Sequence, residues 1–104
     1  IANKWKMFSR PVCVGLDASR FDQHVSVPAL KFTHSIYKRF VRDPEFDRLL
    51  QLMYVNKGRG TAKDGMVKYE VKGCRMSGDM DTALGNCVLM VLMIRALCQE
   101  LSIP

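Results

Sequence analysis

Residues 15–22 read GLDASRFD and place two carboxylates, Asp17 and Asp22, at the end of an apolar run. Residues 11–16 are mostly apolar: Val12, Cys13 and Val14 lie between Pro11 and Gly15. This pattern predicts a short buried strand. Asp17 is then expected at the C-terminal end of that strand, where a carboxylate can hold a metal or face a phosphate-bearing ligand. Because the spacing D-x-x-x-x-D is a weak signal by itself, its meaning depends on a partner stretch elsewhere in the chain.

Residues 73–86, GCRMSGDMDTALGN, provide this partner. Together with GLDASRFDQHVS at 15–26, they resemble motifs A and B in the palm of viral RNA-dependent RNA polymerases, especially those of positive-strand plant viruses of the tombusvirus type. Motif A falls at about 12–24 and motif B at about 73–90. Asp81 departs from the family pattern, in which asparagine is more common, but it lies in a variable gap of motif B.

The resemblance implies an α+β fold, the polymerase palm, in which a ferredoxin-like or RRM-like sheet is covered by helices. We expect the 104 residues to form a partial palm subdomain, because the sequence contains no Gly-Asp-Asp of motif C and no fingers or thumb. The chain begins without methionine, so we interpret it as a fragment of a larger enzyme. The isolated fragment is predicted to be inactive.

The function implied by the resemblance is RNA-directed RNA synthesis during viral genome replication. The expected partners are an RNA template, the nascent strand, ribonucleoside triphosphates and the remaining polymerase subdomains. Two-metal-ion catalysis with Mg²⁺, or Mn²⁺ in its place, implies Asp17 as the catalytic residue and metal ligand, assisted by the backbone carbonyl of Ala18. The resemblance also implies a site for the incoming nucleotide and its 2'-hydroxyl, with residues Asp22, Ser77, Gly78, Thr82 and Asn86.

The net charge of +6 favours a polyanionic partner, although charge alone does not identify one. Between residues 57 and 75 the sequence holds six basic residues against two acidic ones, which predicts either a solvated hairpin or an RNA-contacting one. An alternative function is therefore a non-catalytic RNA-binding or assembly domain that needs neither aspartate. A third, an aspartyl phosphohydrolase using Asp17, usually requires another aspartate where Ser19 stands.

Hydrophobic periodicity predicts the remaining elements. Helices are expected from 26–28 to about 40, from 44 to about 54 and from about 79 to 101, the last of them sandwiched between other parts of the protein. A half-buried strand is expected around residues 67–71, after a glycine-rich loop or hairpin turn at 56–65. Residues expected in the core are Cys13, Ala29, Phe32, Ile36, Phe40 and Cys87.

The remaining expectations concern the first ten residues, membrane spans and the cellular location. The aromatic residues within 1–10 are expected to pack on the sheet, with nucleic-acid binding as the other interpretation. No membrane-spanning segment is predicted, since the longest apolar run, 87–94, is too short and is closed by Arg95. The resemblance implies host cytoplasm, in membrane-associated viral replication complexes.

Overall fold

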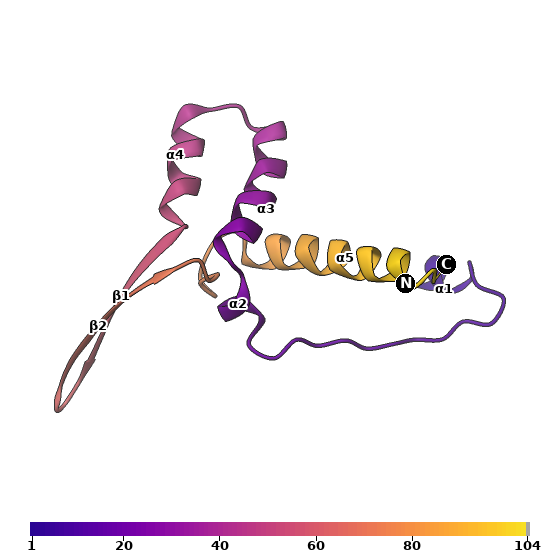
Figure 1. Ribbon diagram of the computed structural model, residues 1–104, viewed down its shortest axis with the longest axis horizontal. Coiled ribbons are helices and arrows are strands. Elements are labelled where there is room, and N and C mark those ends of the chain that lie inside the picture. The colour runs from indigo at the N-terminus through magenta and orange to yellow at the C-terminus, as the bar shows by residue number, and fades with distance from the viewer. Residues whose placement is uncertain (104) are drawn as a thin grey trace.

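A computed structural model describes residues 1–103 as five helices and one β-hairpin. Along the chain the elements are α1 (Ala2–Trp5), α2 (Phe21–His24), α3 (Val27–Phe40), α4 (Pro44–Leu52), β1 (Val55–Ala62), β2 (Gly65–Lys72) and α5 (Thr82–Glu100). Figure 1 shows α3 and α4 side by side, with the hairpin and α5 extending from their base in different directions. The predicted combination of helices and strands is confirmed, and among residues 1–103 the strands form a single two-stranded antiparallel sheet.

Side-chain caps start α3 and α4 where the sequence predicts. The Ser26 hydroxyl accepts a hydrogen bond from the Ala29 amide at 3.4 Å, and proline occupies the first turn. Asp43 accepts from the amides of Glu45 and Phe46, again with a proline in the first turn. These short-range bonds satisfy amides that have no partner inside the helix, so the helix starts are decided locally.

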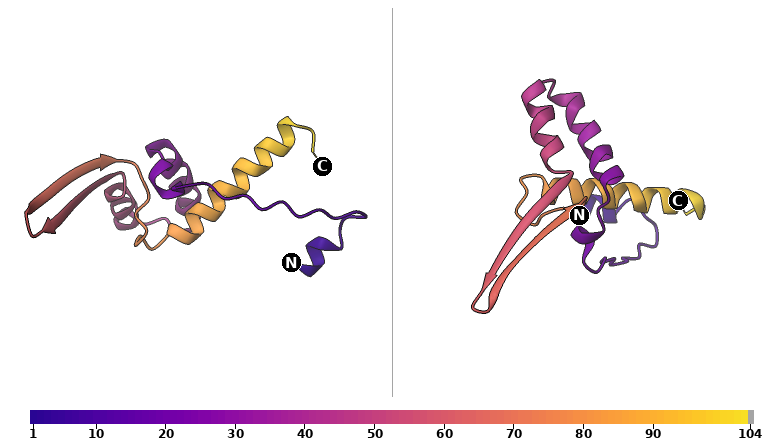
Figure 2. Two further views of the ribbon diagram at one scale, coloured as in Figure 1. Left: turned by 90° about the horizontal axis from the view of Figure 1, so that it is seen from below. Right: turned by 60° about the vertical axis from the view of Figure 1, so that its left-hand side comes forward.

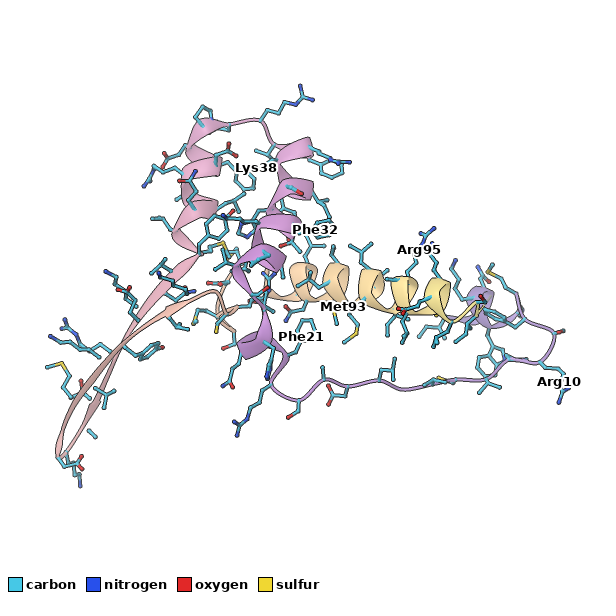
Figure 3. The ribbon with its side chains drawn as sticks, viewed as in Figure 1. Arg10, Phe21, Phe32, Lys38, Met93 and Arg95 are labelled. Carbon is cyan, nitrogen blue, oxygen red and sulfur yellow. The ribbon has the colours of Figure 1, made fainter. Side chains whose placement is uncertain are left out.

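The small hydrophobic core lies where α3 crosses the beginning of α5. Val25, Leu30 and Leu89 are buried there, with Phe21, Ala29 and Tyr54 packed against them. The predicted core positions Phe32 and Phe40 are wrong, because their side chains are 50% and 83% exposed. Figure 3 shows Phe32 on the outer side of α3 and Lys38 directed toward α4, where its ammonium lies 3.2 Å from the Asp47 carboxylate.

The β-hairpin pairs β1 with β2 from Val55 opposite Lys72 to Ala62 opposite Gly65. The predicted strand at 67–71 is confirmed, while most of the predicted loop at 56–65 forms its partner strand and only 63–64 turn. No helix within residues 1–103 covers either face, so the sheet covered by helices that the resemblance implies is not formed, and Val67 and Tyr69 are exposed rather than half-buried. Two further views show the hairpin as an arm that projects from the helices (Figure 2).

The predicted strand at 11–16 is wrong for this structure. These residues form no regular element, and Val12 is 84% exposed. A strand is stable only when a neighbour accepts and donates its backbone hydrogen bonds and covers its apolar face, and no segment of residues 1–103 pairs with it. The same exposure makes the predictions for Cys13 and Cys87 wrong, since both thiols lie at the surface.

Helix α5 is found where a long apolar helix is predicted, but it is not sandwiched. Only 11% of the residues in its apolar stretch are buried, and Val91, Met93 and Leu97 are exposed. By length and composition α5 is apolar enough to cross a membrane, as are many core helices of globular proteins. Its first turns contact the polar side chains of Asp22 and Arg75.

The described chain is much more open than a self-sufficient domain. Its radius of gyration is 18.0 Å, whereas about 13 Å is typical of 100 compact residues. Its accessible surface is 8929 Å², against roughly 5,900 Å² expected for a folded protein of this mass. The excess includes the aromatic residues of the N-terminal ten, so their predicted packing on a sheet is also wrong here: Trp5 and Phe8 are exposed.

Candidate functional site

Backbone hydrogen bonds join the end of the GLDASRFD stretch to the start of the second stretch. The Arg75 amide donates to the Asp22 carbonyl at 2.8 Å, and the Cys74 amide donates to the Val25 carbonyl at 2.7 Å. Gly73 makes this approach feasible: its φ is +80°, and a Cβ there would lie 3.1 Å from the Val25 carbonyl oxygen. The two stretches, distant in sequence, therefore form one local structure.

The side chains of Asp22 and Asn86 meet at the centre of this structure. The Asn86 amide Nδ2 donates to Asp22 Oδ1 at 2.6 Å, a bond that spans 64 positions of sequence. Both residues are partly buried, and the amide oxygen of Asn86 is buried without a hydrogen-bond partner among the described residues. The pair thus presents a carboxylate that is fixed in place, beside an amide oxygen still able to accept a hydrogen bond.

Thr82 uses its hydroxyl to close the loop that precedes α5. Its Oγ1 donates toward the Met76 carbonyl at 2.7 Å and lies 3.0 Å from the Asp79 carbonyl. Asp79 Oδ2 in turn accepts from the Met76 amide at 3.2 Å. In this structure Thr82 therefore positions the loop, and of the two polar residues predicted on this helix face only Asn86 contacts Asp22.

Ser77 and Gly78 lie at the exposed tip of the same loop. Ser77 borders a groove of about 430 Å³ that begins at Asp22 and runs along the base of the hairpin. The other residues lining this groove are Gln23, Tyr69, Val71, Cys74, Arg75 and Met76. Of the predicted nucleotide-site residues, the groove holds Asp22 and Ser77, and Thr82 and Asn86 support it from α5.

A buried ion pair, which the sequence did not reveal, lies beneath the loop. Arg75 is only 2% exposed, and its Nη1 lies 2.7 Å from Asp81 Oδ2. The same carboxylate oxygen accepts from the Tyr37 hydroxyl at 3.1 Å. The guanidinium rests against Gly85, where a Cβ would come within 2.4 Å of Nη2. The one available signal was the placement of opposite charges at 75 and 81, on either side of the Ser-Gly tip.

His34 and Tyr37 extend this cluster into α3. His34 is fully buried, its Nδ1 lies 3.2 Å from the Tyr54 hydroxyl, and the two rings stack at 5.3 Å. Burial lowers the pKa of His34, and the nearby Asp81 carboxylate opposes that shift only in part. Burial and the Asp81 carboxylate raise the pKa of Tyr37 to about 12. Both side chains are therefore neutral at physiological pH, and Arg75 and Asp81 are the charged members.

The structure leaves Asp17 apart from this cluster. Asp17 and Ala18 are exposed in the extended segment that precedes α2 and is drawn below α5 in the view of Figure 1. Ala18 also borders an apolar hollow of about 340 Å³, into which Phe21 of α2 and Met93 of α5 project (Figure 3). Among residues 1–103 no three His, Cys, Asp or Glu side chains gather closely enough to hold a metal ion. A metal at Asp17 needs further ligands from other groups.

Comparison with known proteins places these features in context. A family profile described as "Viral RNA dependent RNA polymerase" matches residues 1–104. The chain is 73% identical over its full length to an RNA-directed RNA polymerase of groundnut rosette virus (strain MC1). It is 52% identical over 97% of its length to the corresponding polymerase of tobacco necrosis virus (strain A), and 46% identical over 96% to that of tomato bushy stunt virus (strain Cherry).

The match covers only a small part of each relative. The chain spans 12% of the groundnut rosette virus protein, 14% of the tobacco necrosis virus protein and 12% of the tomato bushy stunt virus protein. No solved structure matches the chain. The similarity therefore concerns one segment of a much longer protein.

Proposed function

Since this chain belongs to the viral RNA-dependent RNA polymerase family, we propose that the complete protein adds ribonucleotides to an RNA 3' end during viral genome replication. The chain contributes the part of the polymerase site that recognises the incoming nucleotide and holds one of its metal ligands. The observation that carries this proposal is the 2.6 Å hydrogen bond between Asp22 and Asn86, which unites motifs A and B at the edge of a groove.

Asp22 and Asn86 have the chemistry to select ribose over deoxyribose. An ionised carboxylate only accepts hydrogen bonds, and a 2'-hydroxyl is a donor that deoxyribose lacks. The Asn86 amide holds the Asp22 carboxylate in one orientation, so the carboxylate is ready for that donor before the nucleotide arrives. When the donor is missing, a partly buried acceptor is left unpaired, and such sites discriminate strongly against the lacking analogue.

Ser77, Gly78 and Thr82 act on the same nucleotide through the loop. Ser77 presents a hydroxyl at the groove that contains Asp22, and Gly78 gives the loop tip conformational freedom. Thr82 fixes the base of the loop through the Met76 and Asp79 carbonyls. In this arrangement the loop can adapt at its tip to the ribose and the templating base while its base remains anchored.

Asp17 and the Ala18 carbonyl fit a magnesium site in the chemistry of their donor atoms, since Mg²⁺ and Mn²⁺ prefer hard oxygen ligands. Bound metal ions would stabilise the charge on the triphosphate and activate the 3'-oxygen. Two protein oxygens are too few for the six positions that Mg²⁺ requires. We propose that carboxylates of motif C and the triphosphate itself supply the others, and the exposure of Asp17 leaves it accessible to them.

The remaining subdomains are proposed to cover the open faces of the chain. The segment at 11–16, the hollow between Ala18 and Met93, and the exposed side of α5 all present apolar groups. A strand pair carrying motif C would give segment 11–16 the neighbour it lacks and would complete a palm. The alternative of a non-catalytic RNA-binding or assembly domain has no use for the Asp22–Asn86 contact.

Replacing Asp17 with asparagine in the complete polymerase tests the proposal. Asp17→Asn keeps the shape of the side chain but removes the charge, so RNA synthesis should fall by at least a thousandfold while RNA binding and the melting temperature stay unchanged. The matched control is Asp64→Asn, which removes the same charge from the exposed hairpin turn and should leave activity intact. Synthesis by Asp17→Asn within tenfold of the wild-type rate would remove Asp17 from the metal site.

A further inference from the structure

The two faces of the β-hairpin differ completely in charge. In the antiparallel register, all five charged residues of the two strands lie on one face, and the opposite face carries none. We name the charged face the basic ridge; it consists of Lys57, Arg59, Lys68, Lys72 and one acid, Glu70. Since β1 and β2 alternate strictly, this segregation concentrates a net charge of three on one side of a thin arm.

The uncharged face is turned toward the candidate site. Tyr69 and Val71 on that face line the groove that also contains Asp22 and Ser77. The Tyr69 ring lies across β1 at Gly58, where any Cβ would collide with it. The basic ridge therefore faces away from the groove, where it cannot touch the nucleotide in the site.

Two like charges that lie opposite one another on the ridge destabilise the hairpin. Arg59 and Lys68 are direct cross-strand partners, and like charges placed opposite one another in a sheet are destabilising. Neither has an ion-pair partner among residues 1–103, whereas the next pair along the ridge, Lys57 and Glu70, is neutralised at 3.2 Å. An anion seated between Arg59 and Lys68 would remove the repulsion, and a chain of phosphates spaced along the strands would also engage Lys57 and Lys72.

From this arrangement we infer that the basic ridge binds the phosphate backbone of RNA outside the nucleotide site. The inference rests on the proposed function, in which RNA is template and product. A hairpin with only a structural role would explain why the ridge is exposed to solvent. It would not explain why two like charges, Arg59 and Lys68, lie opposite one another without an ion-pair partner among residues 1–103. The ridge and the groove lie on opposite sides of the hairpin. The RNA bound to the ridge is therefore a part of the RNA strand that flanks the nucleotide site, and its binding does not influence the choice between ribose and deoxyribose there.

The test measures how RNA affinity of the complete polymerase depends on salt. Each lost phosphate contact lowers the slope of log affinity against log salt by about 0.7 for single-stranded RNA. Arg59→Gln with Lys68→Gln should therefore reduce the slope by about 1.4 and raise the KM for template, with the preference for ribonucleotides unchanged. Glu70→Gln should act in the opposite direction and tighten binding, because it frees Lys57 and removes the one acid of the ridge.

Arg39→Gln with Arg42→Gln is the matched control, since it removes two exposed positive charges, one near the end of α3 and one in the connection between α3 and α4. An unchanged slope in this control supports the ridge, and an equal fall in both double variants would overturn it in favour of diffuse charge. A slope that stays at the wild-type value in the ridge variant, with Glu70→Gln also without effect, overturns the inference while RNA synthesis continues. Failure of the proposed function would give a different result. The wild-type protein would then bind RNA through the ridge but would synthesise no RNA.

Discussion

The Arg75 guanidinium lies so close to Gly85 that a Cβ at position 85 would overlap it. Arg75 lies between Gly73, where the two motif stretches come together, and Ser77 at the tip of the loop. Its ion pair with Asp81 spans the base of this loop. Asp81 therefore has a structural partner in this chain. Two interactions hold the loop that presents Ser77: the Arg75–Asp81 ion pair and the hydrogen bond from the Thr82 hydroxyl to the Met76 carbonyl.

Gly85→Ala should destabilise the protein, although alanine is normally the better helix residue by about 1 kcal/mol. The new Cβ would overlap the buried guanidinium, and displacing Arg75 breaks its pair with Asp81 at a cost of about 3 kcal/mol. We expect a lower melting temperature for the complete polymerase. Gly60→Ala is the control, because nothing lies within 4 Å of a Cβ at Gly60. A melting temperature raised by Gly85→Ala would contradict this position for Arg75.

At the scale of elements, α3 connects the hairpin base, α4 and the start of α5. It buries Leu30, Thr33 and His34 rather than its phenylalanines, because its inner face meets the polar cluster around Asp81. Tyr37 reaches Asp81 directly at 3.1 Å. The orientation of α3 is thus decided by polar partners as well as by the small hydrophobic core.

The buried His34 makes this packing dependent on pH. Groups that face its ring are Asp81 and Asp79, which favour its protonation, and Arg75 and Lys38, which oppose it, with Tyr37 and Tyr54 beside the ring. Burial dominates and lowers the pKa of His34 below its usual 6.5. Below that value the unfolded chain binds a proton that the folded chain does not, so stability falls as pH falls.

Melting curves of the complete polymerase should reveal this effect. Between about pH 7.5 and about pH 5.5 the wild type should lose more melting temperature than His34→Gln, which cannot titrate in this range. His24→Gln is the control, since His24 is exposed and should follow the wild type. Parallel curves for wild type and His34→Gln would show that the buried His34 does not contribute to the loss of stability at low pH.

At the scale of the whole molecule, the chain is a set of well-formed local elements with few contacts among distant ones. The hairpin and most of α5 stand away from the core, as the views of Figure 2 show, and the surface is well above that of a compact protein. The parts that do meet are the ends of the two motif stretches. The chain spans about one eighth of the groundnut rosette virus protein that it matches, and the open distribution of contacts agrees with a segment of a longer protein.

The sequence predicted what short-range interactions determine. The caps at Ser26 and Asp43 and the turn before Gly65 depend on residues within a few positions, and the structure has all three. The strand at 11–16 was not found, because a strand depends on neighbouring strands and no segment of residues 1–103 pairs with it. The burial of His34 was equally unpredictable, since its cluster includes residues more than about forty positions away and has no periodic pattern.

The candidate site was predicted by a different route, the resemblance of two ordered motifs. That route identified Asp22 and Asn86, which the structure brings into contact across 64 positions. It also implied a hydroxyl role for Thr82 at the sugar, whereas the structure uses this hydroxyl within the loop. Arg75 was missed, because motif patterns do not distinguish residues that touch a ligand from those that hold a loop in place.

The most direct test of the central claim is a double-mutant cycle on ribose selection by the complete polymerase, using Asp22→Ala, Asn86→Ala and both together. The measurement is the ratio of kcat/KM for a ribonucleotide to that for the matching deoxyribonucleotide. If Asp22 and Asn86 act as one unit, each single variant should lower the ratio by about tenfold or more, and the double variant should lower it little further. Unchanged ratios in both single variants, or fully additive losses in the double variant, would contradict a joint site formed by the two motifs.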